Sequence, residues 1–179
     1  RRQEDIPFYK KQTRMVLEHC GHIDATSILE YIGIGGYEAF EKALFDMSAD
    51  DIIAEISDSN LRGRGGGGFP TGKKWSQVRR NQADKKYIVC NGDEGDPGAF
   101  MDRSIMEGDP HRMLEGMMIA GIACGADEGY IYVRAEYPMA VMRLRTAIEQ
   151  AEQLGLLGDH ILGTDFCFRI HISRGAGAF

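Results

Sequence analysis

A run of glycines limits what the first half of this chain can become. Five of the six residues from Gly63 to Gly68 are glycine, and Phe69-Pro-Thr-Gly-Lys-Lys-Trp75 follows directly. Because glycine has no Cβ, the backbone N–H groups of such a run can approach a flat or anionic ligand closely. Arg64, Lys73 and Lys74 add positive charge that suits a phosphate. The run therefore predicts a ligand-binding loop.

Three other interpretations of the run are weaker. A G-x-G-x-x-G dinucleotide pattern starts at Gly63, but that fingerprint follows a strand, and here a helix and a polar loop are predicted before it. A phosphate-binding-loop pattern starts at Gly67, but Lys74 stands where a magnesium-binding Ser or Thr is needed. A flexible linker has little use for the rings of Phe69 and Trp75. We therefore favour a loop that binds a flavin or a nucleotide in a fold different from these two nucleotide-binding types.

An acidic turn follows a predicted strand over 87–90. The chain there reads Cys90-Asn-Gly-Asp-Glu-Gly-Asp-Pro-Gly-Ala-Phe100. Ligands of open α/β sheets bind beyond the carboxyl ends of the strands, so the turn is well placed for a site. Asn91, Asp93 and Glu94 can accept hydrogen bonds from hydroxyl or amide groups. Taken alone, the motif also fits calcium binding or an ordinary acidic turn.

The order of predicted elements indicates the fold class. Short apolar segments alternate with helical patterns, which predicts a three-layer α/β domain with a mainly parallel sheet. The expected strands cover 87–90, 130–133 and 166–172, and the expected helices of this part cover 74–80, 110–124 and 138–154. Asp109 is expected to cap the helix that starts with Pro110.

The residues before the glycine run predict a helical leader. Helices are expected over 6–20, 24–32, 37–44 and 47–56, the last starting at a capping box formed by Ser48 and Asp51. The chain is therefore divided into a leader, 1–56, and an α/β domain, 57–179. The glycine-rich turn at the end of the sequence indicates a truncated domain.

Composition excludes several classes of function. The 179 residues carry a formal charge of -6, so no basic surface for nucleic acid is expected. No apolar run approaches the roughly 20 residues of a membrane span, and residues 1–12 lack a signal core. We therefore expect a cytoplasmic protein without membrane insertion. The cysteines lack metal-ligand spacing, so reduced thiols and no metal site are expected at Cys20, Cys90, Cys124 and Cys167.

Five motifs in order carry a family resemblance. They are Gly-Arg-Gly-Gly-Gly-Gly-Phe-Pro-Thr-Gly72, Cys-Asn-Gly-Asp-Glu-Gly-Asp-Pro-Gly98, Asp109-Pro-His, Tyr130-Ile-Tyr-Val-Arg-Ala-Glu-Tyr137 and Arg174-Gly-Ala-Gly-Ala-Phe179. Together they resemble the FMN- and NADH-binding subunit of respiratory complex I, of NAD-linked hydrogenases and of formate dehydrogenases. The leader motifs Phe8-Tyr-Lys-Lys-Gln12 and Glu18-His-Cys-Gly21 look more like the soluble and bifurcating hydrogenase members.

The resemblance implies a Rossmann-like domain in which FMN accepts hydride from NADH, with no catalytic side chain assigned. The flavin contacts that it implies are Gly63, Arg64, Gly65, Lys74, Asn91, Asp93 and Glu94, and the nucleotide contacts are Gly66, Phe69 and Lys74. Three positions depart from the pattern of complex I. Asp96 replaces a glutamate at a nucleotide contact, Gln77 replaces a phenylalanine at the adenine, and Phe179 replaces a tyrosine.

The resemblance also implies partners. A thioredoxin-like 2Fe-2S subunit and a hydrogenase or other iron–sulfur subunit are expected beside this chain. The family's 4Fe-4S cysteines and its other flavin contacts come after the position of Phe179, so about half of the flavin site is expected here. The alternative is a binding or scaffold fragment without catalysis.

Overall fold

The computed structural model of this chain describes residues 5–176. Before the sheet it contains η2 (Tyr9–Lys11), α1 (Ile28–Gly33), α2 (Glu38–Phe45), α3 (Ala49–Asp58) and α4 (Thr71–Arg80). The α/β part contains β1 (Tyr87–Gly92), α5 (Met101–Gly108), α6 (Pro110–Cys124), β2 (Glu128–Arg134), α7 (Pro138–Gln153), η3 (Ile161–Gly163) and β3 (Arg169–Gly175).

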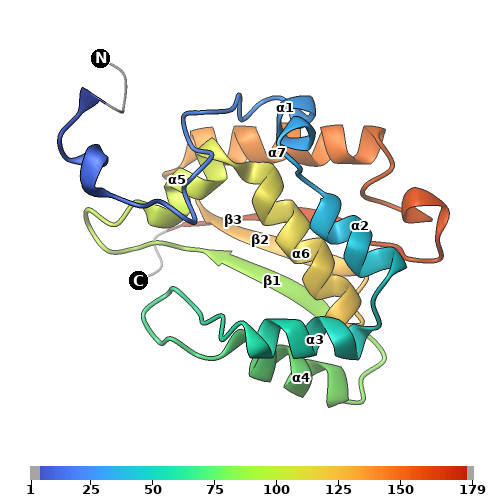
Figure 1. The fold of residues 1–179 in the computed structure, drawn as a ribbon. Helices are drawn as coiled ribbons and strands as arrows, with labels where there is room; N and C mark the ends of the chain where they lie inside the picture. The colour runs from blue at the N-terminus through green and yellow to red at the C-terminus, as the bar shows by residue number, and fades with distance from the viewer. Residues whose placement is uncertain (1–4, 177–179) are drawn as a thin grey trace.

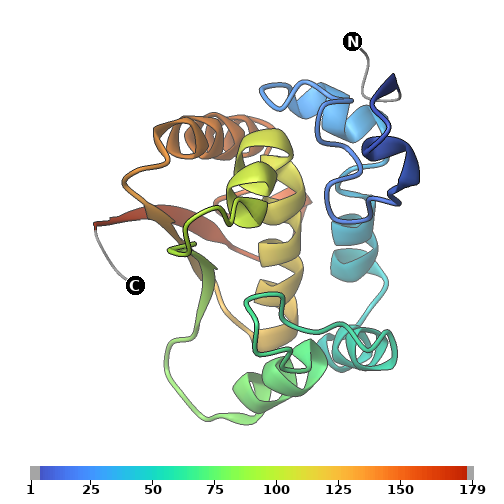
Figure 2. The same cartoon turned by 90° about the vertical axis from the view of Figure 1, so that its left-hand side faces the viewer.

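The sheet is parallel, as the sequence predicts. Its order is β1-β2-β3, with Cys90 opposite Ile131 and Ile131 opposite Ile172. Helices α5 and α6 connect β1 to β2, and α7 connects β2 to β3. Because parallel crossovers are right-handed and both step in the same direction, their helices lie on the same face of the sheet (Figures 1 and 2). The carboxyl ends of all three strands meet at one edge.

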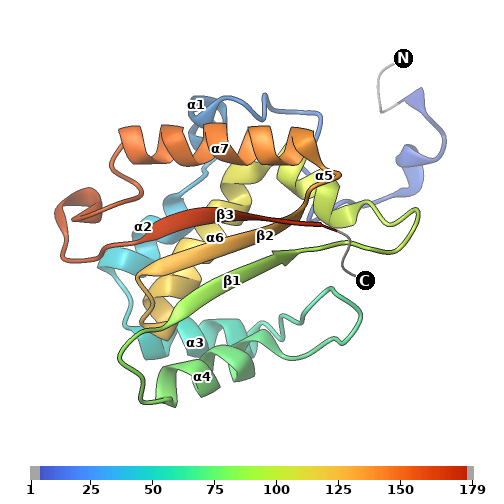
Figure 3. The same ribbon diagram turned by 180° about the vertical axis from the view of Figure 1, so that it is seen from behind.

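The predicted three-layer arrangement is wrong for residues 5–176. One face of the sheet is buried under α6 and α7, where Ile131 and Val133 have no exposed area. On the opposite face Tyr87 is 49% exposed and Val89 is 65% exposed, and Figure 3 shows no described helix over it. The single direction of the crossovers explains this difference, since each one returns its helix to the same face.

The leader helices α1 and α2 form an outer layer on α6 (Figure 2). Phe40 of α2 and Tyr31 of α1 are buried in the same hydrophobic cluster as Ile131 of the sheet. The predicted capping box of α3 is confirmed, because the Ser48 Oγ accepts from the Asp51 N–H and the Asp51 carboxylate accepts from the Ser48 N–H. The leader helices and the α/β part therefore bury their apolar side chains in one shared core.

The predicted helix over 6–20 is wrong, since only the short turn η2 forms there. Phe8 is 70% exposed and Met15 is 71% exposed, so this segment buries no apolar stripe that could stabilise a helix. The segment contacts α6 through Arg112, whose guanidinium donates to the carbonyl of Met15 at 3.2 Å and forms an ion pair with Glu18 at 2.8 Å.

Two further predictions need correction. Pro110 does begin α6, but the side chain of Asp109 makes no cap and instead lies 2.9 Å from Nδ1 of His19. Strand β3 begins at Arg169, and not at residue 166, because the backbone of Phe168 pairs with Gly158 in an antiparallel bridge and the Phe166 carbonyl accepts from the Ile161 N–H at 2.9 Å. Helix α5 was not predicted from the sequence.

Candidate functional site

The glycine-rich run forms a loop between α3 and α4. Its base is a short antiparallel ladder in which the Gly63 N–H donates to the Phe69 carbonyl at 2.9 Å and the Thr71 N–H donates to the Leu61 carbonyl at 2.9 Å. A helix precedes this loop, so the dinucleotide fingerprint lacks its strand, as the sequence indicated. At Gly65 and at Gly66 an added Cβ would meet nothing within 4 Å. The loop backbone therefore faces open space.

The acidic turn is built on local hydrogen bonds. The side-chain oxygen of Asn91 accepts from the Asp93 N–H at 2.9 Å, which bends the chain as it leaves β1. The Glu94 carboxylate accepts from the N–H groups of Met101 at 2.9 Å, Asp102 at 3.3 Å and Arg103 at 3.3 Å. Glu94 thus satisfies the free N–H groups at the start of α5.

The two segments meet at one cavity of about 520 Å³. The glycine-rich loop lines it with Arg64, Gly65 and Gly66, and the acidic turn lines it with Asp93, Glu94 and Asp96. Figure 1 shows both loops on the side of the molecule where the strands have their carboxyl ends. The cavity lies where an open α/β sheet binds its ligands, and its volume is typical of small-molecule sites.

Four of the predicted residues with described positions do not line this cavity. They are Gly63, Phe69, Lys74 and Asn91. The Phe69 ring is 42% exposed, and the ammonium groups of Lys73 and Lys74 lie 5.8 Å and 5.9 Å from its centroid. This cationic cluster stands at the start of α4. Phe179 lies outside the described residues.

Negative charge dominates the cavity. Four carboxylates line it, from Asp93, Glu94, Asp96 and Asp102, against the single guanidinium of Arg64. Burial raises the pKa of Asp102, and the nearby charge of Glu94 raises it further. Such a lining suits ligand hydroxyl and amide donors, with an anionic group held beside Arg64.

Sequence reasoning missed the side chains that the start of α5 brings to the lining, chiefly Phe100 and Asp102. The Phe100 ring is 53% exposed, with the Arg103 guanidinium 5.7 Å from its centroid. An exposed aromatic residue just after a strand-end turn was a usable signal, because flat rings recur in ligand sites. The place of Asp102 in the lining could not be predicted, because α5 itself was not predicted.

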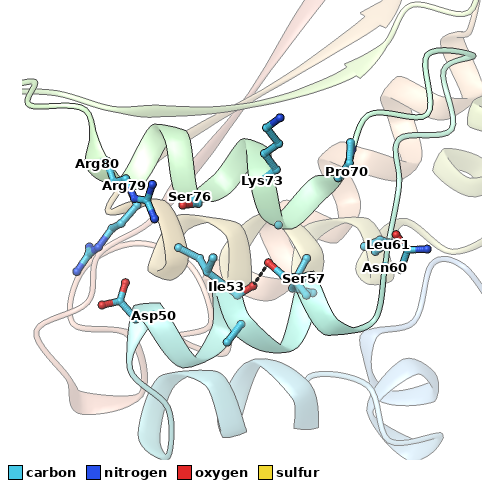
Figure 4. A pocket seen from close by; sticks show the side chains of 13 residues that line it. Asp50, Ile53, Ser57, Asn60, Leu61, Pro70, Lys73, Ser76, Arg79 and Arg80 are labelled. Atoms are coloured by element: carbon cyan, nitrogen blue, oxygen red, sulfur yellow. Dashed lines mark hydrogen bonds between the residues drawn. The ribbon is translucent and has the colours of Figure 1, made fainter.

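A second cavity of about 670 Å³ lies between α3 and α4 (Figure 4), and no residue of the acidic turn lines it. Ile53 and Ser57 line it from α3, and Lys73 and Arg79 line it from α4. Gly72 lets the two helices approach, since an added Cβ would lie 2.8 Å from the backbone of Ser57. This glycine of the phosphate-binding-loop pattern therefore serves helix packing.

Metal ligands do not gather within residues 5–176. No three His, Cys, Asp or Glu side chains of this part are grouped to hold a metal ion, and its four cysteines are free thiols. No helix of the described part is both long and apolar enough to cross a membrane.

The family follows from a comparison with known proteins. The model of the Nuo51 FMN-binding domain matches residues 56–179, which is more than half of the chain. The chain belongs to the Nuo51 FMN-binding domain family. This confirms the resemblance that the five motifs carried, and it confirms FMN as the cofactor of the family.

Relatives of this Nuo51-type chain include a hydrogenase subunit and subunits of NADH-quinone oxidoreductases. It is 52% identical over 170 residues to the NADP-reducing hydrogenase subunit HndC of Solidesulfovibrio fructosivorans, covering 95% of this chain and 34% of the relative. It is 50% identical over 165 residues to an NADH-quinone oxidoreductase subunit of Aquifex aeolicus, covering 92% and 38%. The chain thus spans about a third of the length of these curated relatives.

Solved structures of an NAD+-reducing [NiFe]-hydrogenase contain a fold similar to that of this Nuo51-type chain. A crystal structure of an air-oxidised NAD+-reducing [NiFe]-hydrogenase matches with a TM-score of 0.68 and 30% identity, over 93% of this chain and 25% of that chain. The H2-reduced form matches with a TM-score of 0.70 and 29% identity, over 99% and 30%. The mainly parallel α/β fold that was predicted is therefore confirmed.

Proposed function

We propose that this chain forms one wall of an FMN pocket in an electron-transfer subunit that moves hydride between NAD(H) and FMN. The observation that carries the proposal is the single cavity that joins Gly65 and Gly66 to Asp93 and Glu94 at the carboxyl edge of the sheet. The cavity also suits a flat ring, because the loop backbone at Gly65 and Gly66 opens onto space that a Cβ would enter.

Each part of the wall has a separate task. Gly65 and Gly66 offer bare backbone to a flat ring, and Arg64 offers charge to a phosphate. Asp93 and Asp96 offer acceptors to hydroxyl groups. Glu94 has already placed its carboxylate on the N-terminus of α5, so its main contribution is to hold the turn.

The chemistry needs orientation more than proton transfer. FMN supplies the ring that exchanges hydride with a nicotinamide when both are bound. The task of the protein is to hold two rings in contact and to keep them from moving, which lowers the entropic part of the barrier. This agrees with a wall of glycine backbone and hydrogen-bond acceptors, and no side chain is proposed as a catalytic acid or base.

The proposed assembly follows from the relatives. Those named as hydrogenase and quinone oxidoreductase subunits support a place for this chain beside iron–sulfur partners. We infer a thioredoxin-like 2Fe-2S subunit and a hydrogenase or similar subunit as partners, with a 4Fe-4S cluster in a part of the subunit beyond this sequence. We also infer a cytoplasmic location for the complex.

Two glycines of the same loop provide a matched test. Gly65 lines the cavity and Gly67 does not, yet a Cβ on either one meets nothing within 4 Å. Titrating FMN and following its fluorescence should therefore show a Kd that is about tenfold higher for Gly65→Ala, because a methyl group obstructs the ring. Gly67→Ala should bind as the unchanged chain does. Equal Kd values for both variants would contradict the proposed wall.

The predicted contacts that do not line the cavity need their own test. Asn91→Ala and Lys74→Ala, made in the complete subunit, should both weaken FMN binding if these side chains reach the cofactor. Unchanged affinity in both variants would remove them from the site.

The second candidate function is a scaffold fragment without catalysis. It is favoured by one fact, that the chain spans about a third of its relatives. It predicts that the purified 179-residue chain is colourless, quenches no FMN fluorescence and reduces no ferricyanide with NADH. FMN binding by this chain would exclude it.

A further inference from the structure

The motif from Tyr130 to Tyr137 does not line the cavity, yet it contacts the acidic turn. Arg134 ends β2, and Tyr137 stands directly before α7. The main-chain carbonyl of Glu94 accepts from the Arg134 guanidinium at 2.7 Å and from the Tyr137 hydroxyl at 3.3 Å. Two donors from a neighbouring strand end therefore hold one peptide group of the turn.

These two donors are themselves held in place. The Arg134 guanidinium lies 3.4 Å from the Glu136 carboxylate and 5.6 Å from the centroid of the Tyr137 ring. The Arg103 guanidinium lies 5.4 Å from the same centroid, and Tyr137 is 6% exposed. The tyrosine ring thus contacts two cations, an arrangement that stabilises both guanidinium groups in fixed positions.

Glu94 joins the acidic turn to three elements. Its carboxylate accepts from the backbone of α5, and its carbonyl accepts from the end of β2 and the start of α7. A strand-end turn without such bonds would exchange among several conformations, because loops make few buried contacts of their own. Hydrogen bonds from a charged donor are among the stronger ones, so Arg134 contributes most of this restraint.

We propose that Arg134 and Tyr137 are positioning residues, which hold the Glu94 peptide so that Asp93 and Asp96 keep the shape of the ligand cavity. The identity of the ligand as FMN rests on the proposed function, whereas the restraint on the turn does not. Neither residue is proposed to touch the cofactor.

The test of the restraint uses hydrogen exchange and needs no cofactor. The 179-residue chain is compared with Arg134→Gln, Arg134→Lys and Tyr137→Phe, and with Arg145→Gln as a control on the exposed side of α7. Exchange over residues 92–103 should be about tenfold faster in Arg134→Gln and clearly faster in Tyr137→Phe, since each loses a bond to the turn. Arg134→Lys keeps a cationic donor but loses the planar guanidinium, so it should fall between, and Arg145→Gln should match the unchanged chain.

FMN titration of the same variants supplies the second readout. The Kd should rise about tenfold in Arg134→Gln and recover in part in Arg134→Lys, while the midpoint of thermal unfolding stays close to that of Arg145→Gln. Faster exchange throughout α6 and the sheet, with an unchanged Kd, would show a merely structural role and overturn the inference. Unchanged exchange over 92–103 in both Arg134→Gln and Tyr137→Phe would also overturn it. An unchanged chain that binds no FMN contradicts the proposed function instead, and the exchange result still decides the restraint.

Discussion

Nδ1 of His111 lies 2.8 Å from the hydroxyl oxygen of Tyr37, and both side chains are buried where the leader meets α6. Nε2 of the same ring lies 3.2 Å from the side-chain oxygen of Gln150. A neutral imidazole satisfies both neighbours, because Nδ1 can accept from the hydroxyl while Nε2–H donates to the amide oxygen. The histidine therefore ties α6 to the leader and to α7 without carrying charge.

The stability of this chain should fall on acidification through His111. Burial lowers the pKa of His111, although the bond to Gln150 and the charge of Asp109 act in the opposite direction. The unfolded chain then takes up a proton near pH 6.5 before the folded chain does, so acid favours unfolding. One such group changes the free energy of unfolding by at most about 1.4 kcal/mol per pH unit.

Urea unfolding of the unchanged chain and of His111→Asn, at about pH 5.5 and 7.5, measures this effect. The loss of stability at the lower pH should be smaller in His111→Asn, whatever the absolute stability of that variant. An equal loss in both proteins would assign the pH dependence to other groups.

Local signals allowed most of the helices and strands to be predicted. Helix α7 was expected over 138–154 and forms over Pro138–Gln153, with Gly155 at a positive φ of 69° just after it. The proline at the first position of α7 and the glycine after its end act on their immediate neighbours, so the local sequence is enough to predict both ends of this helix. The same holds for the capping box of α3.

Elements that depend on distant partners could not be predicted in this way. Helix α5 receives its N-terminal acceptor from Glu94, seven residues before Met101, and its Met106 is buried by other elements. The expected helix over 6–20 does not form because no other described element packs over Phe8 or Met15, and both side chains stay exposed. The pairing of the glycine-rich loop with the acidic turn was predicted, whereas Phe100 joined the cavity only through α5.

Removing the Glu94 carboxylate should destabilise the start of α5. The side chain accepts hydrogen bonds from the N–H groups of Met101, Asp102 and Arg103, which would otherwise lack partners. Glu94→Ala should lower the free energy of unfolding by about 1–3 kcal/mol, the usual range for losing a charged acceptor. Asp96→Ala, in the same turn but exposed, should change it by less than about 0.5 kcal/mol. Urea unfolding compares the two, and equal losses would argue against the cap.

Two of the cysteines should resist alkylation in the folded chain. Burial raises the pKa of Cys90 to about 11 and that of Cys124 to about 11. At about pH 8 roughly one thiol in a thousand is then the reactive thiolate. Peptide mass spectrometry after iodoacetamide treatment should find Cys90 and Cys124 modified slowly in buffer and quickly in urea. Rapid modification of both in buffer would show that β1 and α6 open readily.

Gly72→Ala should lower the free energy of unfolding, which distinguishes this helix-packing glycine from the glycines that line the cavity beside the acidic turn. A Cβ at Gly72 would come 2.8 Å from both the Cα and the backbone nitrogen of Ser57, so α3 and α4 must move apart. Overpacking of this kind costs about 1–3 kcal/mol, and Gly67→Ala, which meets nothing, provides the matched control.

The clash also predicts a failed rescue. Adding Ser57→Ala to Gly72→Ala removes the hydroxyl but leaves the backbone of residue 57 in place, so stability should not recover. Thermal unfolding of the single and double variants measures this. Full recovery in the double variant would mean that only the serine hydroxyl opposed the methyl group, and that the two helices can pack at this distance without a glycine.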